Sequence, residues 1–188
     1  TTAPEASRIA IAADGSIIVA EASQHRVSRI TPDGVWQAFA GTGNPGNDGD
    51  GGPALAATLD SPAAVAVLPD GGVVVADAGQ HRLRLVEPDG TIRAFAGTGE
   101  AGMAGDGGPA VDALLDGPVA LAVRPDSTVL VADGNNGLLR SIDAAGRITT
   151  LAGGGAITDC AAGCLRDEVD LTDMREADDG TGGKPSSA

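Results

Sequence analysis

The sequence predicts an all-β fold made of repeated four-stranded antiparallel sheets, and three observations predict it. The first is composition, because the 188 residues include 29 Gly and 11 Pro, a high density of turn formers. The second is a set of short motifs that recur along the chain at one fixed spacing. The third is that each repeat contains four short strand-like segments separated by turn signals.

The recurring motifs lie 56 residues apart, and no gap is needed to align their copies. The motifs are Gln-His-Arg at residues 24–26 and 80–82, Phe-Ala-Gly-Thr-Gly at 39–43 and 95–99, and Gly-Asp-Gly-Gly-Pro-Ala at 49–54 and 105–110. A third copy keeps the offset, because Val-Ala-Asp at residues 75–77 recurs at 131–133. A fixed period of this length is the signature of a solenoid, an array or a propeller.

Each period contains four strand-like segments, which are clearest in the second copy. They are residues 64–68, 73–76, 81–86 and 91–96. Turn residues, such as the Asp-Gly pair at 70–71, separate these segments and predict a four-stranded antiparallel meander. Three such sheets in series predict a β-propeller-type fold with three four-stranded blades.

The strand pattern divides the chain into blades and connections. We expect a lead at residues 1–6, blades at 7–43, 62–99 and 118–153, and connections at 44–61 and 100–117. Each connection has a glycine-rich half followed by a short helical turn, in which Pro53 or Pro109 suits the first helical position. After the blades we expect a cysteine-containing segment at 154–176 and a disordered, acidic and polar tail at 177–188.

Composition and charge exclude several classes of function. Asp and Glu outnumber Lys and Arg by 26 to 12, and the resulting net charge of −14 repels nucleic-acid phosphates. The longest apolar runs reach only about seven residues, so we expect no membrane insertion. The hydrophobic content of 42% is too high for a wholly disordered chain.

Cys160 and Cys164 are the only cysteines of the sequence. They form either a small disulfide loop, which an oxidising compartment would favour, or two free thiols. A zinc site is disfavoured, because zinc needs four ligands and no histidine or further cysteine lies nearby in the sequence. No signal peptide is visible in the sequence.

The recurring motifs resemble NHL repeats over residues 7–153. The resemblance rests on Val-Ala-Asp at the end of the second strand, Gln-His-Arg at the start of the third, and Ala-Gly-Thr-Gly at the end of the fourth. The Gly-Asp-Gly-Gly-Pro-Ala connection is typical of a bacterial and extracellular branch of that family, which implies a secreted or cell-surface protein.

Propellers of this family most often have six blades, so three blades imply half of a ring. The two end blades would then expose apolar faces, and we expect either a homodimer that completes the ring or a longer protein.

Two histidines are the first candidates for chemistry. His25 and His81 occupy equivalent repeat positions, which indicates that they build each blade alike. The resemblance implies that the family's lyases use non-equivalent histidine, arginine and acidic residues near the central axis. The interpretation therefore leans away from an enzyme, and no catalytic residue is assigned.

Arg26 and Arg82 follow these histidines and are candidate binding residues. The structural alternative is that each pairs with a carboxylate of its own blade, such as Glu21 or Asp77. The structural alternative is favoured, because a guanidinium suits a fixed carboxylate partner.

The first connection contains closely spaced oxygen-bearing side chains. Asn47, Asp48 and Asp50, with glycines beside them, resemble a short calcium loop. The glutamate that completes a full calcium loop is absent, and the second copy keeps a single acid, Asp106. The alternative is a glycine-rich turn with an Asp that caps the short helix. Asp48, Asp50 and Asp106 are thus candidate binding residues, and calcium is the only candidate cofactor.

These observations favour a non-catalytic binding or scaffold module. Its rim loops would present a contact surface to a protein or another extracellular ligand while the blades hold them rigid. One alternative is a fragment of a propeller enzyme, a lyase or hydrolase, whose active centre lies in blades outside this sequence. Another alternative is a piece of a sensor or adhesin ectodomain.

Overall fold

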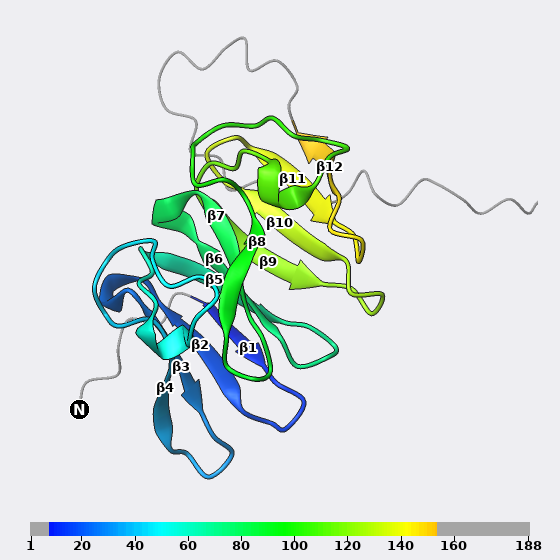
Figure 1. Cartoon of the computed structure of the whole chain (residues 1–188). Coiled ribbons are helices and arrows are strands. Elements are labelled where there is room, and N and C mark those ends of the chain that lie inside the picture. Colours follow the sequence, from blue (N-terminus) through cyan, green and yellow to red (C-terminus); the bar gives the residue numbers. More distant parts are fainter. Residues whose placement is uncertain (1–7, 154–188) are drawn as a thin grey trace, which may run out of the picture. The chain divides into compact units, whose positions relative to one another are not determined.

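The computed structural model describes residues 8–153, which form three four-stranded antiparallel sheets (Figure 1). In each sheet the strands lie in chain order, as in a meander. The strands of blade 1 are β1 (Arg8–Ile11), β2 (Ile17–Glu21), β3 (Arg26–Ile30) and β4 (Trp36–Ala40). Those of blade 2 are β5 (Pro62–Val67), β6 (Val73–Asp77), β7 (Arg82–Val86) and β8 (Ile92–Ala96). Those of blade 3 are β9 (Pro118–Val123), β10 (Val129–Asp133), β11 (Leu138–Ile142) and β12 (Ile148–Gly153). The all-β class and the three propeller-type blades are therefore confirmed.

The turn between the second and third strands of a blade uses a left-handed residue. In blades 1 and 2, the 3-10 helices η1 (Ala22–Gln24) and η3 (Ala78–Gln80) end at His25 and His81, whose φ angles are 49° and 50°. In blade 3 this position belongs to Gly137, with a φ of 62°. Because glycine adopts this conformation without steric cost, blade 3 keeps the turn after losing the histidine.

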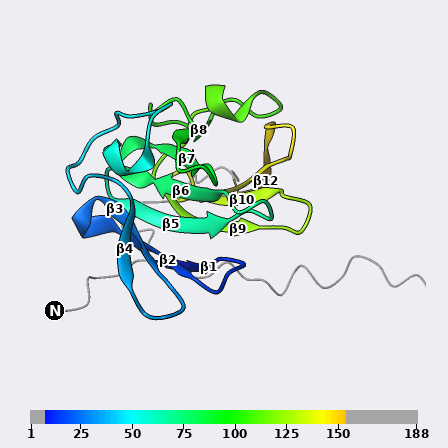
Figure 2. The ribbon, with the colours of Figure 1, turned by 60° about the horizontal axis from the view of Figure 1, so that its bottom comes forward.

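The blades pack against each other through two apolar clusters. The first joins blades 1 and 2 and includes Val27, Leu59 and Val75, which are almost completely buried. The second joins blades 2 and 3 and includes Leu83 and Ile148, which are equally buried. The first strands β1, β5 and β9 are neighbours, as Figure 2 shows. Blade 2 is thus covered on both faces, and this sandwiching holds its turns in place.

Each connection lies across the blade that follows it. The connections contain the 3-10 helices η2 (Ala54–Ala56) and η4 (Ala110–Asp112). The prediction for their prolines was wrong, because Pro53 and Pro109 precede these helices with extended ψ angles of 132° and 133°. The reason is that both prolines form bridges with the next blade, at Thr91 and Arg147, which needs an extended backbone.

Within the described residues, no helix is long and apolar enough to cross a membrane. The predictions for Cys160 and Cys164, for the segment 154–176 and for the tail 177–188 lie outside the described residues.

A candidate binding groove between the second and third blades

A buried arginine of blade 2 forms hydrogen bonds with several oxygen atoms of the first connection. Arg84 is completely buried and donates hydrogen bonds from Nε and Nη2 to Asp50 Oδ1, at 3.0 and 2.7 Å. Its guanidinium also donates to the carbonyl oxygens of Asp48 (3.1 Å) and Thr58 (2.7 Å). On its other side, Nη1 lies 3.9 Å from the buried carboxylate of Asp77. Arg84 therefore ties the connection to the centre of the blade.

Blade 3 repeats this arrangement around Arg140. This residue is also completely buried, and its Nη2 lies 2.7 Å from Asp106 Oδ1 in the second connection. Burial raises the pKa of Asp106, but hydrogen bonds from Thr150 and Arg140 outweigh it and hold that pKa below its usual value. Sequence reasoning missed both arginines as partners of the connections. The available signal was their own spacing, since residues 84 and 140 also lie 56 apart.

The two arginines predicted as binding residues lie in different surroundings. Arg26 donates from Nε to Glu21 at 2.8 Å, as the structural alternative predicted. Arg82 does not pair with Asp77; it donates to the Asn47 carbonyl at 2.5 Å and lies 3.5 Å from Asp50. The cause is the next arginine on the strand, which takes the place beside Asp77. In blade 1 that position is Ser28, so Arg26 can reach the carboxylate of its own blade.

These contacts engage the loop that the sequence offered as a calcium site. The carbonyl oxygens of Asn47 and Asp48 and the carboxylate of Asp50 all accept hydrogen bonds from Arg82 or Arg84. Of the three side chains predicted as calcium ligands, Asp50 is thus bonded to a guanidinium, whereas Asn47 and Asp48 are held through their backbone carbonyls. In the part of the chain that the structure describes, no group of three metal-binding side chains is present.

The two histidines link neighbouring blades. His25 Nδ1 accepts the Ser61 N–H at 3.2 Å and lies 3.3 Å from Asp60 Oδ1. In the next blade, His81 Nδ1 accepts the Gly117 N–H at 3.2 Å and lies 3.0 Å from Asp116 Oδ1. Both histidines bind the segment that enters the following blade, so residues at equivalent repeat positions have the same structural role. The Ser61 hydroxyl donates to Asp60 Oδ1 at 3.0 Å, whereas His25 accepts the Ser61 backbone N–H, so these contacts are not a hydrogen-bonded pair of nucleophile and base.

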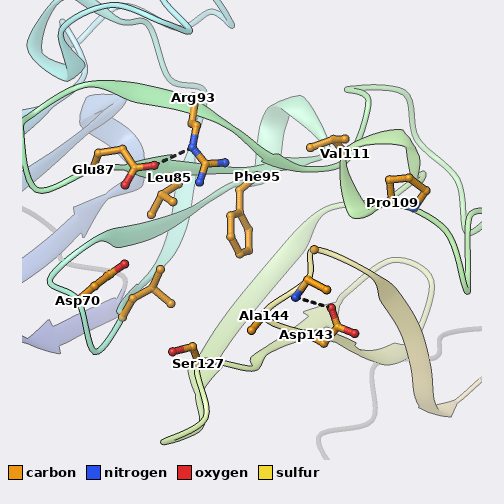
Figure 3. A pocket seen from close by; sticks show the side chains of 13 residues that line it. Asp70, Leu85, Glu87, Arg93, Phe95, Pro109, Val111, Ser127, Asp143 and Ala144 are labelled. Atoms are coloured by element: carbon orange, nitrogen blue, oxygen red, sulfur yellow. Dashed lines mark hydrogen bonds and ion pairs between the residues drawn. The ribbon is translucent and has the colours of Figure 1, made fainter.

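A groove of about 590 Å³ lies between the turns of blades 2 and 3. The four hairpin turns that join β5 to β6, β7 to β8, β9 to β10 and β11 to β12 all contribute to its wall. Apolar side chains form part of the lining, namely Leu68, Leu85, Phe95, Pro109 and Val111. In Figure 3 the ring of Phe95 points into the groove, with Asp70 and Glu87 on one side and Asp143 on the other.

The charges around this groove are mainly negative. Its lining contains three acids, Asp70, Glu87 and Asp143, and one base, Arg93. Arg93 Nε donates to Glu87 Oε1 at 2.7 Å, so this base is already paired and two carboxylates remain in excess. Asp143 Oδ1 accepts the backbone N–H of Ala145 at 2.9 Å, which holds its turn in one conformation. An aromatic ring beside fixed carboxylates can hold a cation that also carries apolar groups.

The sequence shows similarity to known proteins in two comparisons. Residues 59–84 match the family model described as NHL repeat. A stretch of 98 residues is 35% identical to the protein SUPPRESSOR OF QUENCHING 1, chloroplastic, of Arabidopsis thaliana. That match covers 52% of this chain and 9% of the plant protein, so the chain spans a small part of that relative.

Solved structures show the same fold. A Bacteroides thetaiotaomicron protein of unknown function matches with a TM-score of 0.60 and 19% identity, over 78% of this chain and 35% of that one. A virginiamycin B lyase from Staphylococcus aureus, solved with Quinupristin, matches with a TM-score of 0.57 and 17% identity, over 83% and 44%. A gluconolactonase from Xanthomonas campestris matches with a TM-score of 0.56 and 15% identity, over 80% and 48%. The chain spans less than half of each of these proteins, and identities this low establish the fold alone.

Blades 1 and 2 repeat one motif set in register, and blade 3 keeps part of it. The matched residues 59–84 run from the end of the first connection into blade 2, and the structural neighbours share the fold. The chain therefore contains a match to the NHL repeat at residues 59–84, within a β-propeller-type fold.

Proposed function

We propose that the chain is a non-catalytic binding module that holds a cationic, partly apolar segment of a protein partner in the groove between blades 2 and 3. The observation that carries the proposal is the composition of this groove, an apolar lining with Phe95 and an excess of carboxylates. An amphiphilic cation would bury its apolar part against the ring and keep its charge near the acids.

The groove is held rigid by the blades beneath it. The turns at its rim rest on the apolar cluster between blades 2 and 3, which includes Leu85 and has Phe95 packed against it. Asp70 Oδ1 accepts the Gly72 N–H at 2.9 Å, which stabilises the turn between β5 and β6. A preformed groove binds with less loss of conformational entropy than a flexible loop.

The charge of the whole chain supports the same class of partner. A net charge of −14 attracts basic segments over long distances and repels acidic ones. The long-range field affects mainly the association rate, whereas the groove itself supplies the contacts that slow dissociation.

The apolar inner strands also favour binding over catalysis. The first strands carry Ile9, Val65 and Leu121 at equivalent positions, and β5 and β9 contain no ionisable side chain. General acid–base chemistry would need titratable groups positioned to face a substrate there.

The test is a selection from a displayed library of random peptides on the purified full chain, followed by fluorescence anisotropy with a selected peptide. We expect enriched peptides to combine Lys or Arg with an apolar residue and to bind more weakly as salt concentration rises. Phe95→Ala and Glu87→Lys should each weaken binding by roughly 10-fold or more. Selected peptides without basic residues, or binding that both substitutions leave unchanged, would refute the proposal.

A matched pair of variants guards against indirect effects on folding. Val111→Asn changes an exposed apolar residue that lines the groove. Leu55→Asn changes the exposed residue at the same repeat position one blade earlier, outside this groove. We expect the first variant to weaken peptide binding and the second to leave it unchanged.

A further inference from the structure

The connections show how the outer strand of a blade is covered. The first connection runs along β8, where the Gly51 N–H donates to the Ile92 carbonyl at 2.7 Å and the Ile92 N–H donates to the Gly52 carbonyl at 2.9 Å. The Ala54 N–H then donates to the Gly90 carbonyl at 2.8 Å. Ile92 is completely buried as a result.

Blade 3 receives its connection in the same way. Gly107 and Gly108 exchange hydrogen bonds with Ile148 at 2.7 and 3.1 Å, and the Ala110 N–H donates to the Gly146 carbonyl at 2.8 Å. Ile148 is again completely buried. The binding mode is therefore a property of the repeat, and any blade with the same outer strand can receive a connection.

Blade 1 has the same face, but within residues 8–153 nothing covers it. Trp36 occupies the position of Ile92 and is 42% exposed, and no connection of the described chain binds its backbone. Ile9, which occupies the position of the 4% exposed Val65, is 61% exposed. Ile11 is 71% exposed. These three residues mark a blade face that lacks the blade it is shaped to contact, and we call it the blade 1 face.

The side of blade 3 that faces away from blade 2 also exposes an apolar residue that is buried at the same position in blade 2. Leu139 is 39% exposed, whereas Leu83, at the same position in blade 2, is completely buried against blade 3. We call this side, marked by Leu139, the blade 3 face. The two faces are thus the two halves of one blade–blade contact, of which the chain shows two intact examples.

The buried charges indicate which occupant fits the blade 1 face. In blades 2 and 3, Arg84 and Arg140 each require an Asp from the incoming connection. Blade 1 has Ser28 at this position, so an incoming Asp would find no guanidinium partner. The sequence that follows blade 3, residues 154–176, contains no Gly-Asp-Gly-Gly-Pro motif. A contact from blade 3 to blade 1 is the pairing in which neither side leaves an unpaired buried charge.

We propose that the blade 1 face docks against the blade 3 face of a second copy of this chain, head to tail. Each copy contributes one of each face, so two copies can satisfy all four faces and close a ring of six blades. This interaction surface is independent of the groove between blades 2 and 3, and either proposal can fail without the other.

The fluorescence of a single tryptophan can report on this contact. Trp36 is the single tryptophan, and docking would remove its exposed ring from water. We expect light scattering after size exclusion to give twice the chain mass of 18.3 kDa. On dilution into the dissociating range, the tryptophan emission should shift to longer wavelength and become more accessible to acrylamide.

Charged substitutions on the two faces test the geometry. Ile9→Asp and Leu139→Asp each place an unpaired charge in the contact and should raise the dimer Kd by about 100-fold or more. Both residues are exposed in the single chain, so the fold should survive the change, which circular dichroism checks. Met103→Asp is the control, because this residue is 63% exposed on a connection and lies on neither face.

Mixing the two variants distinguishes a head-to-tail contact from a face-to-face one. An equimolar mixture of the Ile9→Asp and Leu139→Asp chains retains one contact between two unaltered faces, so mixed dimers should reappear. A wild-type chain that stays monomeric with solvent-exposed Trp36 at all concentrations would overturn the proposal. A dimer that tolerates both substitutions, or a mixture that stays monomeric, would overturn it as well.

Discussion

At the scale of single residues, the core is not wholly apolar, because several ionisable side chains are buried in it. Asp77 is completely buried at the end of β6, where Oδ1 accepts the Asp60 N–H at 2.7 Å. Its Oδ2 has no hydrogen-bond partner, and Arg84 is 3.9 Å away. Burial raises the pKa of Asp77 to about 7, against the lowering effects of that N–H and of Arg84.

The raised pKa of Asp77 predicts a particular dependence of stability on pH. The folded chain binds a proton at Asp77 that the unfolded chain, with an ordinary pKa near 4, has released. The free energy of unfolding should therefore fall as pH rises from about 4 to about 7 and level off above that. Urea unfolding at pH 5 and pH 8 should show a loss of about 2 kcal/mol from this group.

The matched variant for this prediction is Asp77→Asn, which keeps an acceptor for the Asp60 N–H but does not titrate. We expect the difference in the free energy of unfolding between wild type and Asp77→Asn to change between pH 5 and pH 8. A constant difference from pH 5 to pH 8 would show that Asp77 does not titrate in the folded chain.

At the scale of elements, the glycines after the fourth strand explain why that motif recurs. Gly97 follows β8 with a φ of +86°, and its N–H donates to the Ala110 carbonyl at 2.8 Å. A Cβ atom there would lie 2.7 Å from the His81 carbonyl oxygen. Gly41, one blade earlier, has the same geometry against the His25 carbonyl, also at 2.7 Å. The glycine and the histidine turn of each motif are thus in contact, and this contact links two distant parts of the repeat.

This contact predicts different costs for two similar substitutions. Gly97→Ala must displace backbone atoms and adopt a positive φ, whereas Gly90→Ala, at a φ of +85°, meets no atom within 4 Å. We expect about 1 kcal/mol of destabilisation for Gly90→Ala from backbone strain alone. Gly97→Ala should cost at least about 2 kcal/mol more, because the contact adds overpacking. Chemical unfolding followed by circular dichroism measures both, and equal costs would contradict the proposed contact.

At the scale of the whole described region, stability should be shared between neighbouring blades. Blade 2 packs against an apolar cluster on each face, whereas blades 1 and 3 each share only one of the two clusters. In repeat proteins, stability is approximately a sum of unit terms and nearest-neighbour terms. The central blade is therefore expected to open last.

Hydrogen exchange can measure this order. In the Ile9→Asp chain, which removes the proposed association, amides of β6 should exchange more slowly than those of the equivalent strands β2 and β10. Amides of β7 should likewise exchange more slowly than those of β3 and β11. Hydrogen-bonded amides at matched repeat positions provide the internal control, since their local geometry is the same. Uniform protection across the three blades would indicate a single cooperative unit instead.

The sequence by itself determined the features that depend on local periodicity. Short alternating segments and turn residues at one offset predict the three four-stranded sheets, as the structure confirms. The motif set also predicts the NHL repeats, and the family match at residues 59–84 bears this out. These features follow from backbone geometry within a few residues, so they can be read directly along the chain.

Only the tertiary structure decided which distant side chains meet. Arg82 and Arg84 lie two residues apart, yet one bonds to Asn47 and the other to Asp50 and Thr58, more than twenty residues earlier in the chain. No local pattern shows that Arg84 would be buried, or that its guanidinium would bond to Asp50 of the candidate calcium loop. The groove is also invisible in the sequence, because its lining combines turns from two blades. The repeat determines the form of each blade, but the packing of one blade on the next determines which groups are buried, paired or left open to a partner.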